Sequence, residues 1–125
     1  MNVKIDTKER FIVFAPLTGE LTANMTDELI NMLRPYLQKD IPHIILNLSA
    51  VTDMDEKSCE MIANIQQEFY EANCSFVICE LQKAVEDKLD QFEILEVLNV
   101  TPTESEAWDI VQMEEVEREL MGDEE

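Results

Sequence analysis

Two short apolar runs, separated by a segment of helical length, constrain the fold of this chain more than any other feature. Residues 43–48 read His-Ile-Ile-Leu-Asn-Leu, and residues 75–79 read Ser-Phe-Val-Ile-Cys. Runs of this kind are typical of strands covered on both faces, which occur mainly in parallel sheets. Residues 56–72 between them supply the helical crossover that parallel strands need. One stripe of that helix holds its core-facing residues, which are Ser58, Ile62, Ile65 and Phe69.

The other segments extend this alternation and predict an α/β fold with the order β-β-α-β-α-β-α-β-α. Further strands are expected at residues 3–5, 11–17 and 97–100, and further helices at 24–39, 83–92 and from Thr103 onward. Pro35 should bend the first helix or end it a turn early. The alternation predicts a central mixed, mostly parallel sheet of about five strands, flanked by about four helices and joined by right-handed crossovers.

The C-terminal segment is expected to be a helix that continues into an acidic extension. Glu106 follows Thr103 by three residues, which resembles a capping box, and Trp108, Val111 and Met113 are expected to anchor the helix. At 125 residues the chain has the size of one domain, which we assign to residues 1–113. Residues 114–125 are mostly acidic, and we interpret them as a frayed helical extension and solvated tail.

The charge of the chain excludes several classes of partner. Nine Lys and Arg residues against 28 Asp and Glu residues leave a formal charge of -19, which repels nucleic-acid phosphates and anionic lipid surfaces. The apolar runs are far shorter than the roughly 20 residues that cross a bilayer. The N-terminus has no signal-peptide pattern, so a cytoplasmic protein without membrane insertion is expected.

The cysteines and the single histidine give no sign of metal or cofactor chemistry. The three cysteines lack metal-ligand spacing, and Cys59 and Cys79 lie in apolar patterns that favour buried, reduced thiols. His43 is expected at the surface, where its strand begins, rather than in a catalytic role. No nucleophile-base pair and no Gly-rich phosphate fingerprint is present, so neither a cofactor nor a metal is predicted.

The stretch Asp55-Glu56-Lys57-Ser58 lies where a buried strand gives way to a helix. Asp55 is a good N-cap, and Glu56 in the first turn suits the positive end of the helix dipole. Ser58 is expected to face the core or to satisfy a backbone amide. This local interpretation explains most of the stretch without any function.

The order of elements and three short motifs resemble the STAS domain of anti-sigma factor antagonists and sulphate transporters. Leu17-Thr18-Gly19-Glu20-Leu21 is similar to the family's Gly-Glu-Leu-Asp type turn, with Thr22 in place of the Asp. Residues 44–48 followed by 51–55 are similar to its central strand and the Asp after it. Residues 76–80, with the Ala84-Val85 and Leu89 pattern, are similar to its next strand and short helix. The resemblance covers residues 3–112.

The resemblance implies a switching site that this chain has altered. Family members place a phosphorylatable serine two residues after the Asp, and Lys57 occupies that position here without a hydroxyl. Ser58 is the alternative phosphorylation site if the motif is shifted by one residue. The resemblance further implies a partner-binding surface formed by Gly19, Glu20, Thr22, Asp53, Asp55, Glu56, Lys57 and Ser58.

The function implied by the resemblance is that of a non-enzymatic, anti-anti-sigma-type regulator of bacterial transcription. Its partner would be an anti-sigma factor or a kinase-like regulator, and the chain itself would be a monomer or a weak dimer. One alternative is an accessory or scaffold subunit of a transporter or signalling assembly. An alternative of another class is a small acid-base enzyme that uses Glu20 and Asp55, although no convergent nucleophile accompanies them.

Overall fold

The computed structural model of the protein describes residues 2–38 and 43–122. The strands are β1 Val3–Thr7, β2 Phe11–Pro16, β3 Glu20–Leu21, β4 His43–Asn47, β5 Asp53–Met54, β6 Phe76–Cys79 and β7 Val100–Thr101. The α-helices are α1 Ala23–Leu33, α2 Glu56–Glu71, α3 Lys83–Gln91 and α4 Glu104–Gly122. Two short 3-10 helices complete the described elements, η1 Arg34–Gln38 and η2 Leu95–Val97.

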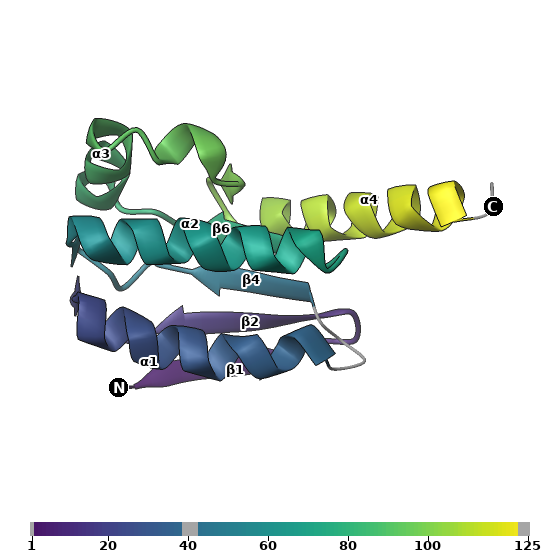
Figure 1. Ribbon diagram of the computed structural model, residues 1–125, viewed down its shortest axis with the longest axis horizontal. Helices are drawn as coiled ribbons and strands as arrows, with labels where there is room; N and C mark the ends of the chain where they lie inside the picture. The colour runs from purple at the N-terminus through teal and green to yellow at the C-terminus, as the bar shows by residue number, and fades with distance from the viewer. Residues whose placement is uncertain (1, 39–42, 123–125) are drawn as a thin grey trace.

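Five strands form the central mixed sheet in the order β1-β2-β4-β6-β7 (Figure 1). β1 runs antiparallel to β2, whereas the β2-β4, β4-β6 and β6-β7 pairs are parallel. The predicted α/β fold with a mostly parallel sheet and four helices is therefore confirmed. β3 and β5 form a second, two-stranded parallel ladder that the sequence analysis did not predict.

Helices cover both faces of the sheet, as the continuous apolar runs require. Alternate residues of β2 point to opposite faces, so that Phe14 packs in the larger core cluster and Val13 in the smaller one. The larger cluster lies under α1, α2 and α3, and the smaller cluster lies under α4. Phe69 of α2 and Phe76 of β6, with ring centroids 5.3 Å apart, join the helix layer to the centre of the sheet.

Local signals predicted most element boundaries well. α1 ends at Leu33 and gives way to a 3-10 helix that contains Pro35, as expected for a proline that ends a helix early; residue 39, where that helix was expected to end, lies outside the described residues. The hydroxyl of Thr103 accepts the Glu106 amide at 3.2 Å, so α4 begins at the predicted cap. The strand expected at 97–100 is wrong for its first three residues, because Val97 belongs to η2 and β7 begins only at Val100.

Two expectations about single side chains are wrong. His43 is buried, because its Nδ1 accepts the Ser75 amide at 3.0 Å and the imidazole thus has a polar partner inside the fold. Met113 does not anchor α4 and is 58% exposed. It follows the buried Val111 by two residues, and successive helical residues are about 100° apart, so the two side chains point to nearly opposite sides.

The cysteines are buried thiols. Cys59 and Cys79 lie in the core as predicted, and Cys74 is buried as well. Burial raises the pKa of Cys59 to about 11 and that of Cys79 to about 12, so both remain protonated at neutral pH.

α4 continues without a break across residues 113 and 114, the point at which we divided domain from extension. Residues 114–122 are helical, whereas the last part of the predicted tail, 123–125, lies outside the described residues. Assigning 114–125 to a separate extension therefore stays a prediction.

Candidate functional site

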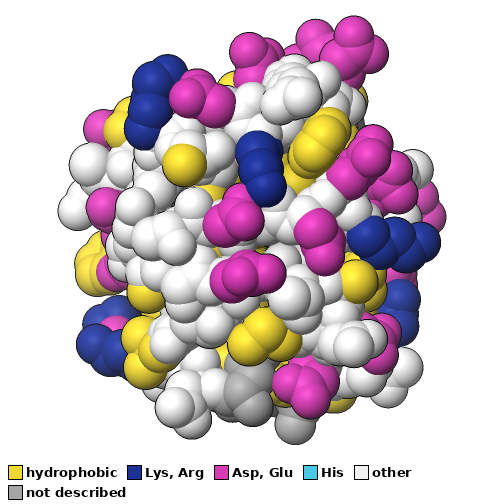
Figure 2. Space-filling view, turned by 90° about the vertical axis from the view of Figure 1, so that its left-hand side faces the viewer, with side chains coloured by type: hydrophobic (Ala, Val, Ile, Leu, Met, Phe, Trp, Pro, Cys, Tyr) yellow, Lys and Arg dark blue, Asp and Glu magenta, His cyan; other side chains and the backbone are white. Residues whose placement is uncertain are grey.

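Two segments far apart in the sequence meet at the carboxyl-terminal end of the sheet. β3 and β5 pair in register, with Glu20 opposite Asp53. The carbonyl of Gly19 accepts the Thr52 amide at 2.7 Å, the Thr52 hydroxyl at 2.8 Å and the Asp53 amide at 3.1 Å. These bonds fix the 18–22 turn against the segment that precedes α2. Figure 2 shows this end of the molecule, where acidic side chains are interspersed with a few basic ones.

Asp55 binds the first turns of two helices at once. One carboxylate oxygen accepts the Ser58 amide at 2.8 Å and caps α2, while the other accepts the Ala23 amide of α1 at 3.2 Å. Hydrogen bonds from Ser58, and then from the Ala23 amide, lower the pKa of Asp55, because they stabilise the carboxylate form. The predicted N-cap is confirmed, and the same side chain also holds α1 beside α2.

Ser58 faces the core, as the helical stripe predicts. Its side chain is fully buried, and its hydroxyl donates to the Leu21 carbonyl at 3.0 Å. This bond joins α2 to β3 beneath the turn. A phosphate could be added at Ser58 only after the hydroxyl had left this buried position.

Lys88 of α3 completes the site, and the sequence analysis missed it. Its ammonium group lies 2.5 Å from a carboxylate oxygen of Asp53 and donates to the Met54 carbonyl at 3.2 Å. The hydrogen bond from Lys88 lowers the pKa of Asp53. The only signal for Lys88 in the sequence was its place beside Leu89 on the predicted α3, which gives no information about a contact more than 30 residues away.

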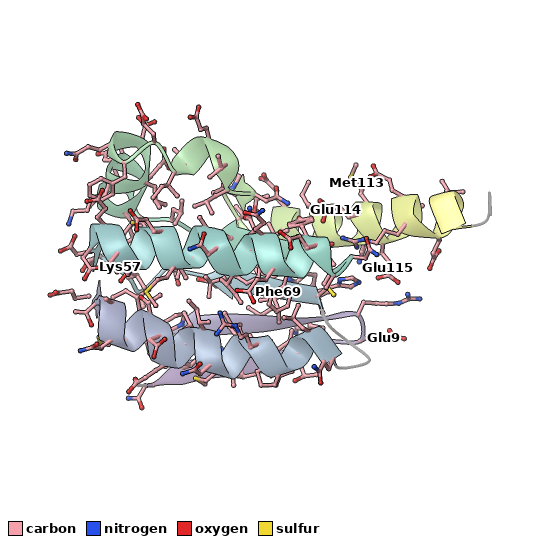
Figure 3. The ribbon with its side chains drawn as sticks, in the orientation of Figure 1. Glu9, Lys57, Phe69, Met113, Glu114 and Glu115 are labelled. Atoms are coloured by element: carbon pink, nitrogen blue, oxygen red, sulfur yellow. The ribbon has the colours of Figure 1, made fainter. Side chains whose placement is uncertain are left out.

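Glu56 and Lys57 are both exposed, and unlike Asp55 and Ser58 beside them, neither side chain forms a hydrogen bond or an ion pair with a residue in the described ranges. They lie in the first turn of α2, and Figure 3 labels Lys57 at the outer end of that helix. Because no hydrogen bond or ion pair with the described residues fixes them, both side chains are available to another molecule.

The site therefore brings together every residue that the resemblance implied. Thr22 caps α1, with its hydroxyl accepting the Met25 amide at 3.4 Å, and Glu20 is exposed beside it. Gly19 has no positive backbone φ, and a Cβ there would lie 3.5 Å from the Thr52 hydroxyl, so the backbone alone does not require glycine. Within 2–38 and 43–122, no group of three His, Cys, Asp or Glu side chains is placed to hold a metal.

The chain is a small α/β domain with a mixed sheet, in which Asp55 joins the starts of α1 and α2 at the carboxyl-terminal end of the sheet. The family description of the STAS domain matches residues 2–107, and the chain belongs to the STAS domain family.

Solved structures agree with this assignment at the level of fold. TM1081 of Thermotoga maritima, a proposed anti-sigma factor antagonist, is 20% identical with a TM-score of 0.76, over 88% of this chain and 94% of that chain. A single-substitution form of RsbS from Moorella thermoacetica is 16% identical with a TM-score of 0.74, over 90% and 96%. The unphosphorylated anti-sigma factor antagonist SpoIIAA is 17% identical with a TM-score of 0.71, over 89% and 96%.

In the described part of the chain, no helix has the length and apolar character needed to span a bilayer.

Proposed function

We propose that this STAS domain is a cytoplasmic, non-enzymatic module that binds a regulatory protein through the first turn of α2 and the 18–22 turn. The partner class is the anti-sigma factor or related serine kinase, in keeping with the anti-sigma factor antagonists that share the fold. The site binds its partner without being phosphorylated at Lys57. The chain thereby acts as an antagonist that a kinase does not switch off.

One observation carries the proposal: the side chains of Glu56 and Lys57 form no hydrogen bond or ion pair with the described residues, while those of Asp55 and Ser58 beside them do. Asp55 and Ser58 are both engaged in bonds that hold α1, α2 and β3 together. Glu56 and Lys57 project from that rigid support into solvent. A surface of free charged side chains on a fixed helix end suits recognition of a protein partner.

The charge of the surface supports a constitutively active form. Glu56 and Lys57 together carry no net charge, whereas phosphorylation of a serine in this turn would add about 1.5 to 2 negative charges. The site thus keeps the charge of an unphosphorylated motif. Glu56 and Lys57 are longer than the serines of the family motif, so a partner must offer space and opposite charges for both side chains.

Phosphorylation can be tested by restoring the hydroxyl. The wild-type chain and Lys57→Ser would each be incubated with ATP and the anti-sigma kinases of the source cell, and phosphate mapped by mass spectrometry. We expect phosphate on the substituted position of K57S and none on the wild type. Stoichiometric phosphate on Ser58 of the wild type would refute the unswitched site, and Ser58→Ala identifies such a product.

Partner binding can be tested by charge reversal on the same turn. Lys57→Glu is expected to weaken binding to the purified anti-sigma factors about tenfold or more, because a contact at the centre of an interface would become repulsive. Lys4→Glu, an equal change on the exposed edge strand β1, should leave binding unchanged. Equal binding by all three proteins would exclude the α2 turn as the contact surface.

A second candidate is an accessory or scaffold subunit of a transporter or signalling assembly. It is favoured by the STAS fold that the chain shares with part of the murine anion transporter Slc26a9, 13% identical with a TM-score of 0.69 over 83% of this chain and 18% of that chain. The two candidates predict different captured partners, an anti-sigma factor in one case and a membrane-protein subunit in the other. An acid-base enzyme has less support, because both oxygens of Asp55 accept backbone amides and its pKa is lowered.

A further inference from the structure

α4 has apolar side chains on two opposite sides, and only one of them is used by the fold. The helix lies along the face of the sheet opposite α1, α2 and α3, and its C-terminal half extends past the end of the strands (Figure 1). A helix that packs on one side only normally has a polar outer face. The outer face of α4 therefore needs an explanation.

The side of α4 that faces the body is fully engaged. Val111 is buried in the core cluster against the sheet. Farther along, the carboxylate of Glu114 accepts the Tyr70 hydroxyl at 2.8 Å, and Arg118 donates to the Ser75 hydroxyl at 3.0 Å. These contacts fix both the position and the rotation of the helix.

The opposite side carries a stripe of large apolar side chains that we call the outer stripe, made of Met113, Val116 and Leu120. Their spacing of three and four residues places them on one helical face. They are 58%, 53% and 63% exposed, respectively. Figure 3 shows Met113 pointing away from α2. Half of the large apolar side chains that are exposed among the described residues belong to this one stripe.

Acidic side chains border the outer stripe. An open hollow on this face is lined by Asp109 and Glu117 together with Gln112, Met113 and Val116. The sole cation in the sequence of α4 is Arg118, and it is turned toward the body. At the other edge of the stripe, Arg10 lines a second hollow with Val116 and Glu119, and its guanidinium pairs with Glu115. The stripe is thus an apolar strip whose border is mostly negative.

This pattern of charge selects the occupant. A second copy would place two acidic borders side by side on chains that each carry a formal charge of -19, and Arg10 beside the stripe is already paired with Glu115. A helix with its own apolar stripe and Lys or Arg at its edges would instead cover the apolar side chains and neutralise the border. The acidic border therefore favours a basic amphipathic helix over self-association.

We propose that the outer stripe of α4 is a docking surface for a basic amphipathic helix of a second protein. It lies on a different part of the molecule from the α1 and α2 helix starts, which Figure 1 places at the opposite end of the sheet. The domain can consequently hold two partners at once and bring them together.

The binding test uses synthetic helices and purified full-length protein. The probe is a fluorescein-labelled peptide of Leu, Ala and Lys whose leucines repeat at helical spacing, and binding is followed by fluorescence anisotropy at about 0.15 M salt. Two control peptides separate the terms: one replaces Lys with Glu, and one keeps the composition in shuffled order. The variant M113Q/V116Q/L120Q removes the stripe while keeping charge and helix propensity. Val97→Gln removes an apolar side chain that is similarly exposed elsewhere.

We expect the lysine peptide to bind the wild type and V97Q equally, and the triple variant at least about tenfold more weakly. The glutamate and shuffled peptides should bind the wild type no better than the lysine peptide binds the triple variant. The proposal is overturned if the triple variant binds the lysine peptide as well as the wild type does, or if the shuffled peptide binds equally well. Sedimentation that finds a wild-type dimer and a monomeric triple variant would also overturn it, by making a second copy the occupant.

Discussion

The first turn of α2 and the outer stripe of α4 differ in how far the residues proposed for binding also hold the fold together. At the first turn of α2, Asp55 and Ser58 hold three elements together while lying within the surface proposed to meet a partner. On the outer stripe of α4, Met113 and its neighbours contribute little to the fold and remain exposed. A change at Asp55 or Ser58 is expected to disturb structure and binding together, whereas a change on the outer stripe is expected to affect binding alone.

This difference decides which substitutions are informative. At α2, only Glu56 and Lys57 can report on binding without altering the supporting bonds. At α4, the whole outer stripe can be removed while Val111 and Glu114 still anchor the helix. The predictions below test how far stability and recognition separate in each region.

The largest effect is expected for Asp55→Ala. The Ser58 and Ala23 amides both lose their acceptor, so we expect the free energy of unfolding in urea to fall by roughly 1–2 kcal/mol. Asp55→Asn should lose less, because its amide oxygen can still accept one of the two bonds. Met113→Gln is the control for the opposite region and should stay within about 0.5 kcal/mol of the wild type. An unchanged stability for D55A would mean that the double cap does not hold the two helices.

A smaller loss is expected for Tyr70→Phe, which tests how α4 is held on the body. The Tyr70 hydroxyl donates to Glu114 at 2.8 Å, which joins α2 to α4, and it accepts the Asn99 side-chain amide at 2.6 Å, which joins α2 to the segment before β7. We expect a loss of about 1 kcal/mol. Trp108 is the only tryptophan, and its ring packs against Phe11 of the sheet with ring centroids 5.3 Å apart. Its fluorescence therefore reports on the packing of α4 against the sheet.

The measurement for Y70F is urea unfolding followed by both tryptophan fluorescence and far-UV circular dichroism. If α4 separates first, the fluorescence transition moves to lower urea than the dichroism transition. Coincident transitions with the expected loss would mean that α4 unfolds with the rest of the domain. M113Q, which changes the outer side of the same helix, should move neither transition.

Local chemistry made much of the fold predictable from the sequence. The apolar runs at β4 and β6, the cap at Thr103 and the stop near Pro35 depend on neighbours within a few residues, and all were predicted correctly. The N-cap role of Asp55 followed for the same reason. Its second bond, to Ala23 in another helix, did not follow, because it depends on how α1 and α2 pack.

The two errors about single side chains share one physical cause, which is that residue type does not specify the direction in which a side chain points. Met113 was expected in the core because it is apolar, yet the rotation set by Val111 turns it outward. His43 was expected outside because it is polar, yet the Ser75 amide satisfies it inside. Lys88 was overlooked because its partner Asp53 belongs to another element. The sequence alone could not reveal the direction of these side chains or the pairing of residues far apart in the chain.

We expect the stability of the domain to depend on pH through His43, which begins β4. Burial, and then the nearby Arg118, lower its pKa, although Glu115 opposes this shift. The unfolded imidazole titrates near about 6.5, so between that value and the lower folded pKa the unfolded state binds the extra proton. Stability is therefore expected to be present above pH 6.5 and to be lost progressively as the pH falls below it.

The check compares the free energy of unfolding at about pH 7.5 and pH 5.5, above the range in which ordinary carboxylates titrate. The wild type should lose more stability across this interval than His43→Gln, which has no titrating ring. Comparing the two differences cancels the general effect of the acidic surface, because both proteins carry it. Equal losses would show that protonation of His43 is not linked to folding.

The smallest effect is expected at Gly19, the turn residue opposite the α2 start. A Cβ there lies 3.5 Å from the Thr52 hydroxyl, an ordinary contact, and the backbone φ is not positive. Gly19→Ala should therefore stay within about 0.5 kcal/mol of the wild type in urea unfolding. Thr52→Val, which removes the hydroxyl bond to the Gly19 carbonyl, should cost more, about 1 kcal/mol.

This pair of variants separates the two tasks of the turn. If G19A keeps its stability but weakens partner binding, the missing side chain serves close approach of a partner, and the turn resembles the outer stripe of α4. If G19A keeps both, the turn contributes through the Gly19 carbonyl alone, and recognition is confined to the first turn of α2. A loss of stability in G19A greater than in T52V would contradict the geometry on which both interpretations rest.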